Sequence, residues 1–169
     1  VAGKGIKGDR NYYDNNEARK QITLIESESI DYYNQKFNTN FSYLDLRRNL
    51  VTKDIRLNDL IGKKLSIGQI DIQVHDLCRP CNYLQEILGK DNIIKEFLRR
   101  GGLRCEILIS GNIKAGDEIS GHFVYGHVDC VAKICKRPGG KRETDFYLFV
   151  DRPSWRNQGK PHRISEESF

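Results

Sequence analysis

One run of alternating residues restricts the possible folds more than any other feature of this chain. Residues 60–77 read LIGKKLSIGQIDIQVHDL, and apolar residues alternate with polar ones on both sides of Gly68 and Gln69. Such alternation is typical of strands that bury one face, and a short glycine turn between two of them indicates a β-hairpin. We therefore expect this stretch to form two paired antiparallel strands.

A strand followed by a helix is predicted near the start of the chain. Residues 21–26 read QITLIE, which is short, apolar and rich in β-branched side chains. Ile30, Tyr33 and Phe37 then recur at helical spacing, which predicts a helix over this part of the chain. Ser27 or Ser29 is expected to cap it.

The remaining segments up to residue 120 are predicted to be short strands and helical turns, several of them ending at glycine. An extended segment is expected over 45–57, helical turns over 82–100, and two strands joined by a tight turn over 103–120. Many short strands with few helices between them favour a barrel or a sandwich over a doubly wound parallel sheet. The expected fold class is mainly β, with a barrel-like sheet and a few peripheral helices.

Composition bounds the domain organisation and the setting. A chain of 169 residues is long enough for one domain with a real core. Residues 1–119 hold 19 Lys and Arg against 17 Asp and Glu, so they are nearly neutral, whereas 120–169 hold 9 against 6. We expect a domain over 1–119 whose first strand is missing, and a basic extension over 120–169 that combines a β-hairpin with a loose tail. A chain cut after residue 120 is therefore expected to fold.

Several function classes receive no support from the sequence. No apolar run approaches the roughly 20 residues that span a bilayer. One tryptophan among scattered basic residues is not a nucleic-acid-binding signature. Five unevenly spaced cysteines argue against a secreted disulfide framework and favour a reducing, cytoplasmic location.

The motif CRPC at 78–81 allows three interpretations. Cys78 and Cys81 could form a thiol-disulfide redox couple, although the expected hairpins do not provide the βαβ context of that motif. Together with His75 and Cys105 they could bind zinc. Alternatively, one cysteine could be a lone soft ligand for a metal cofactor. The residues of the motif do not decide between the three.

Two basic segments could hold an anionic ligand. Arg47 and Arg48 precede Asn49, and two guanidiniums beside a side-chain amide suit an anion that also accepts hydrogen bonds. The alternative is a solvated strand edge. The glycines of GKGIKGDR, which ends at Arg10, lack a preceding strand and a following helix, so a turn is favoured over a dinucleotide-binding loop.

Taken in order, these segments resemble the MOSC domain, the family named for the C-terminal domain of molybdenum cofactor sulfurases. The resemblance rests on five pieces: GKGIKGDR, RKQITLIESESI, LRRNLVTKDIRLNDLIGKKLSIG, IDIQVHDLCRPC and RGGLRCEILISGNIKAGDEI. It implies a β-barrel-like fold with peripheral helices, and a molybdenum cofactor (molybdopterin) whose metal is bound by Cys81. It also implies that Arg47, Arg48 and Asn49 bind the cofactor, with Arg48 ranked first, and that Arg10 is a weaker candidate.

The resemblance implies two functions that the sequence does not separate. As an enzyme of the stand-alone bacterial type, the protein would reduce N-hydroxylated small molecules at a molybdenum held by Cys81. Its electrons would come from a separate reductase, because no flavin or haem motif is present. As a carrier, it would hold persulfide sulfur on Cys81 or pass on the cofactor without turnover.

Overall fold

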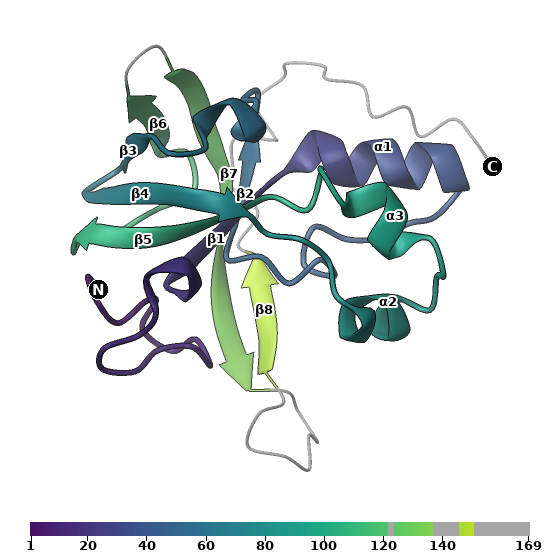
Figure 1. Cartoon of the computed structure of the whole chain (residues 1–169), viewed down its shortest axis with the longest axis horizontal. Coiled ribbons are helices and arrows are strands. Elements are labelled where there is room, and N and C mark those ends of the chain that lie inside the picture. The colour runs from purple at the N-terminus through teal and green to yellow at the C-terminus, as the bar shows by residue number, and fades with distance from the viewer. Residues whose placement is uncertain (122–123, 137–145, 151–169) are drawn as a thin grey trace.

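The computed structural model describes residues 1–121, 124–136 and 146–150 (Figure 1). The chain forms eight described strands together with a few short helices. In order they are η1 (Ala18–Lys20), β1 (Ile22–Glu26), α1 (Ser27–Phe37), β2 (Leu50–Lys53), η2 (Leu57–Leu60), β3 (Lys64–Ile67), β4 (Ile70–Leu77), α2 (Asn82–Leu88), α3 (Ile93–Phe97), β5 (Leu103–Ile109), β6 (Glu118–Gly121), β7 (Val124–Lys136) and β8 (Phe146–Val150).

Seven of the described strands pair into a closed ring. The order is β2-β1-β5-β4-β3-β6-β7, and β7 returns to pair with β2, while β8 pairs with the far end of β7. Only β1 and β2 run parallel among these pairs, and α1 makes the crossover that a parallel pair requires. The mainly β fold predicted from the sequence is confirmed. The α-helices gather on one side of the strands (Figure 1).

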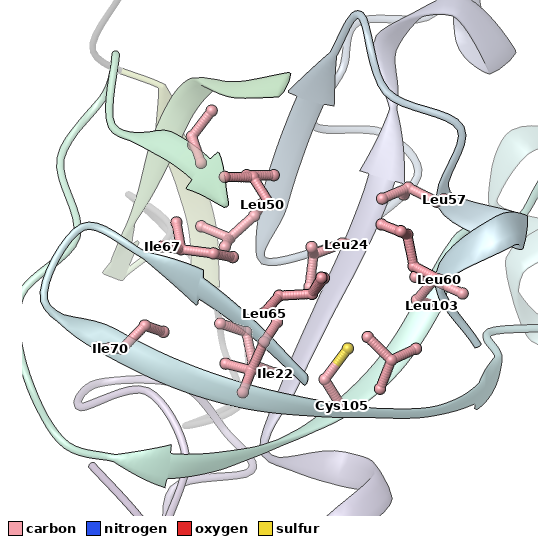
Figure 2. Close-up of a cluster of buried hydrophobic side chains, with 14 of the residues drawn as sticks. Ile22, Leu24, Leu50, Leu57, Leu60, Leu65, Ile67, Ile70, Leu103 and Cys105 are labelled. Atoms are coloured by element: carbon pink, nitrogen blue, oxygen red, sulfur yellow. The ribbon is translucent and has the colours of Figure 1, made fainter. Parts of the chain in front are cut away.

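Two apolar clusters lie on opposite faces of β1. Leu24 points into the barrel, where Figure 2 shows it with Leu50 and Leu65 in the space that the strands enclose. The next residue, Ile25, packs under the helices with Tyr33 and other side chains. Successive side chains of a strand point to opposite faces, so a strand covered on both sides needs the near-continuous apolar run seen at 22–25.

Most of the elements expected from the sequence are present, with two local differences. The hairpin is formed by β3 and β4, with Gly68 and Gln69 between them. At the start of α1 no serine caps the helix. Glu26 takes that position, and its carboxylate accepts hydrogen bonds from the backbone N–H of Leu57 (2.7 Å) and the hydroxyl of Ser29 (3.3 Å).

The segment expected to be extended over 45–57 is a strand only at Leu50–Lys53. Arg47 has φ of 56°, in the left-handed region, so the chain turns before it enters β2. Arg47 and Arg48 therefore do not lie on one regular strand.

Part of the region 120–169 belongs to the ring. β7 pairs with β6 at one end and with β2 further along, and β8 pairs antiparallel with β7. The loose tail expected at the end of the 120–169 extension, from residue 153 onward, lies outside the described residues. In the part of the chain that the structure describes, no helix is long and apolar enough to cross a membrane.

Candidate functional site

The segment 77–81, which runs from the last residue of β4 to the residue before α2, carries the cysteine pair and is called the cysteine loop below. Its last residue, Cys81, is solvent-exposed and occupies the N-cap position of α2. The carbonyl of Cys81 accepts a hydrogen bond from the N–H of Gln85 (3.2 Å), the first bond of that helix. Cys81 thus presents a thiol to solvent from a fixed backbone position.

Arg48 anchors the cysteine loop to the barrel from inside. Its side chain is buried, and its guanidinium donates to three backbone carbonyls, those of Gly101 (2.7 Å), Leu46 (3.0 Å) and Cys78 (3.1 Å). The N–H of Cys78 also donates to the carbonyl of Gly102 (2.7 Å). Three segments that are distant in sequence therefore meet at one buried cation.

The double glycine before β5 allows the cysteine loop to approach this closely. A Cβ at Gly101 would overlap the carbonyl oxygen of Cys78, and a Cβ at Gly102 would overlap the carbonyl of Leu24. Gly102 also has φ of 91°, which side-chain-bearing residues rarely adopt. Gly101 is therefore needed for the close packing of the cysteine loop, and Gly102 for the close packing of the chain against β1.

The cysteines near the site differ in accessibility. Burial raises the pKa of the Cys78 thiol, although the Arg48 and Arg104 guanidiniums partly oppose that shift. Burial also raises the pKa of Cys105, which packs in the barrel core. Of these three cysteines, only Cys81 is exposed, so it is the thiol best placed to meet a ligand from solvent.

A β-bulge places a charged cluster at the end of β4. Between Val74 and Asp76 the pairing with β5 shifts by one residue, so that Asp76 lies opposite Arg104. The Asp76 carboxylate accepts two hydrogen bonds from Arg104 (2.8 and 2.6 Å) and contacts Arg19 at 3.3 Å. Asp76 is thereby neutralised beside the cysteine loop.

Two adjoining hollows of about 470 and 380 Å³ lie beside the cysteine loop. They share Ile61, Leu77 and Arg79, so they form one groove. Within residues 1–121, Arg79 and Arg99 make no ion pair with a carboxylate. The groove therefore offers an apolar surface with free positive charge. Among the described residues, its lining is Asn58, Ile61, Asp76, Leu77, Arg79, Leu98, Arg99 and Arg104.

The residues predicted from the sequence separate into different environments. Arg48 is buried against the cysteine loop, whereas Arg47 is exposed, with its guanidinium 5.5 Å from the ring centre of Tyr83. Asn49 donates to Asp9 (2.6 Å) and accepts from Thr23, which ties the loop at residues 8–10 to β1. Arg10 is exposed on that loop. Their roles as cofactor ligands stay predictions.

The zinc interpretation is wrong for the described residues. No group of three or more His, Cys, Asp or Glu side chains among them is placed to hold a metal ion. The ring of His75 instead lies 3.1 Å from the Glu106 carboxylate, and Cys105 is in the core. A cofactor that brings its own sulfur ligands needs only one protein thiolate, and Cys81 can provide it.

Sequence reasoning missed most of the groove. Arg99 and Arg104 come from the end of the helical region and from β5, and Ile61 follows η2. The one sequence feature that pointed to the groove was the arginine pair at 99 and 100, just before Gly101 and Gly102. Nothing in that signal indicates which sheet partner those arginines face.

Arg48→Ala is expected to destabilise the fold far more than Arg47→Ala. The first change leaves three buried carbonyls without their charged donor, so we expect a loss of about 3 kcal/mol or more in the free energy of unfolding. Arg47 makes an exposed contact with an aromatic ring, worth under about 1 kcal/mol. Urea unfolding of both variants measures the difference; similar losses would contradict the anchoring role of Arg48.

Comparisons with known proteins agree with this architecture. A family model described as the MOSC domain matches residues 10–120. The crystal structure of YiiM from Geobacillus stearothermophilus is similar in fold, with a TM-score of 0.57, 20% identity, and coverage of 62% of this chain and 55% of that chain. A crystal structure of a hypothetical protein also gives a TM-score of 0.57, with 16% identity and coverage of 76% and 59%. The aligned regions thus span less than two thirds of either neighbour. No curated protein matches the chain significantly.

Proposed function

Because the chain belongs to the MOSC domain family, we propose that it binds the molybdenum cofactor at Cys81 and reduces N-hydroxylated small molecules. The observation that carries the proposal is the exposed Cys81 thiol at the end of a loop that also lines the arginine-bearing groove. An exposed thiol near guanidiniums that form no ion pair among the described residues suits a soft metal on an anionic organic carrier.

The donor set fits this cofactor. Cys81 would hold the metal, and Arg79 and Arg99 would bind the phosphate of the pterin. Ile61, Leu77 and Leu98 give the flat pterin an apolar surface. When bound, the molybdenum supplies a redox centre for oxygen-atom chemistry. The protein residues hold that centre beside an open groove into which a small substrate can diffuse.

The proposed reaction needs a source of electrons outside this chain. Reducing an N-hydroxylated amine breaks the N–O bond, consumes two electrons and two protons, and releases water. Solvent can supply the protons at an open site. The chain shows no flavin or haem motif, so we infer that a separate electron-donor protein supplies the electrons.

Metal analysis and mass spectrometry of the full chain test the proposal against the carrier alternative. Purified from a host that makes the cofactor, the protein is expected to contain close to one molybdenum per chain and to reduce an N-hydroxylated amine with a chemical reductant. A persulfide on Cys81 without molybdenum would favour sulfur transfer instead. Molybdenum without any turnover would favour a cofactor carrier.

Arg79→Ala and Arg99→Ala are each expected to weaken cofactor binding. Each removes a charge-assisted hydrogen bond to phosphate, worth roughly 1.5–3 kcal/mol, which corresponds to roughly 10- to 100-fold in affinity. Cofactor released during dialysis at two salt concentrations measures the loss. Lys64→Ala, which removes an exposed cation on β3, is the control. Equal retention by all three variants would show that the groove does not hold the phosphate.

A further inference from the structure

The helix that follows Cys81 exposes an apolar pair to solvent. Tyr83 and Ile87 of α2 are 56% and 50% exposed, and their spacing of four residues places them on one face of the helix. Leu84 of the same helix is instead buried in the cluster under the helices. Tyr83 and Ile87 therefore do not serve the core, and we call them, with Arg47 above the Tyr83 ring, the α2 face.

The surroundings of the α2 face are strongly cationic. Across residues 45–48 and 79–100, six exposed side chains are Lys or Arg and only two exposed side chains are Asp or Glu. Two further carboxylates in these ranges are not fully exposed, and one of them, Glu96, pairs with Lys36. The exposed cations are Arg47, Arg79, Lys90, Lys95, Arg99 and Arg100, and the exposed carboxylates are Glu86 and Asp91.

The excess of positive charge in residues 1–119 falls in these two ranges. The two ranges hold seven Lys and Arg against four Asp and Glu, whereas the rest of residues 1–119 holds twelve against thirteen. An aromatic and aliphatic centre within a rim where exposed cations outnumber exposed carboxylates matches the anatomy of a protein-binding surface. The complementary partner is acidic.

We propose that the α2 face docks a small acidic one-electron carrier protein that delivers electrons to the site at Cys81. The inference rests on the proposed function, which creates the need for an external donor. Tyr83 is two residues from Cys81, so a protein seated here would lie next to the metal ligand. Electron-transfer encounters use small interfaces and are steered by opposite charge, which agrees with a compact apolar pair in a cationic rim.

The electron balance sets how such a partner works. Each reduced carrier is oxidised by one electron per encounter, so two encounters supply the two electrons that cleave one N–O bond. Two protons come from solvent, and water leaves. A transient complex that dissociates quickly between encounters is therefore required, and a salt-sensitive interface provides it.

A strongly acidic [2Fe–2S] ferredoxin serves as the probe, and basic cytochrome c serves as the charge-reversed comparison. Binding to the full chain is measured by titration calorimetry at low and high salt, with and without molybdenum. The double variants Tyr83→Ala with Ile87→Ala, and Lys90→Glu with Lys95→Glu, are each expected to weaken ferredoxin binding about tenfold or more, the scale of hot-spot losses. Raising the salt concentration is expected to weaken the wild-type complex as well.

Matched controls lie elsewhere on the barrel. Leu108 and Ile109 of β5 are a second exposed apolar pair, and Lys63 and Lys64 are a second exposed cationic pair. Their Ala and Glu variants are expected to bind ferredoxin like the wild type. Ferredoxin binding that the α2-face variants leave within about twofold, or that cytochrome c equals, would overturn the inference.

Turnover with a small reductant separates this inference from the proposed function. If the α2-face variants reduce substrate normally with reduced methyl viologen but slowly with ferredoxin, both stand. If viologen supports turnover and ferredoxin neither binds nor supports it, the docking inference alone fails. If the protein holds no molybdenum, the proposed function fails, and the calorimetry still decides whether the α2 face binds an acidic carrier.

Discussion

Cys81→Ser is expected to abolish molybdenum retention while leaving the fold intact. A serine hydroxyl is a harder and far less acidic ligand than a thiol, so a soft metal loses its one protein bond. The side chain is exposed, and its backbone hydrogen bond to Gln85 does not involve the sulfur. Molybdenum per chain is measured by elemental analysis, and the unfolding midpoint is compared with that of the wild type.

Cys78→Ser is the matched control for this prediction. Cys78 lies in the same loop, but it is less exposed, and burial raises the pKa of its thiol, which disfavours the thiolate form. We expect this variant to keep most of its molybdenum. If Cys78→Ser loses the metal and Cys81→Ser keeps it, the ligand assignment is reversed. If both variants keep the metal, it binds elsewhere.

The strands of this fold could be predicted from sequence because they are local patterns. The alternation around Gly68 specifies both the strands and their partner, since two turn residues leave only one antiparallel register. The return of β7 to β2 could not be predicted in this way. Leu50 pairs with Val131, so the information that closes the ring is spread over two segments far apart in the chain.

The same contrast explains the site. Cys81 could be identified because a chemically distinctive residue in a short motif can be recognised from the sequence alone. The different environments of Arg47 and Arg48 could not be predicted, because they depend on the left-handed backbone conformation at Arg47. The Arg47 side chain is exposed, whereas the Arg48 guanidinium donates to three backbone carbonyls. The groove arginines are hidden for another reason, since Arg79 and Arg99 become neighbours only after the barrel forms.

Removing β7 and β8 by ending the chain at residue 121 is expected to prevent cooperative folding. The sequence pattern alone led to the opposite expectation, because the recognisable motifs end near residue 120. In the structure, β7 is the partner of both β2 and β6. Its Val128 is fully buried in the barrel core and exchanges backbone hydrogen bonds with the segment before β6, from Gly116 (2.8 Å) and to Asp117 (2.7 Å).

The size of this effect follows from what the truncation exposes. β2 and β6 would each present an unpaired edge, and Leu50 and Ile119 of the core would lose their cover. A domain with about 5–15 kcal/mol of total stability does not tolerate the loss of a central strand. A chain ending at residue 150 keeps every described strand and is the control. Calorimetry is expected to show a sharp unfolding transition for the control and none for the shorter chain, because the barrel needs β7 to close. A sharp transition for both would mean that residues 1–121 form a complete core without it.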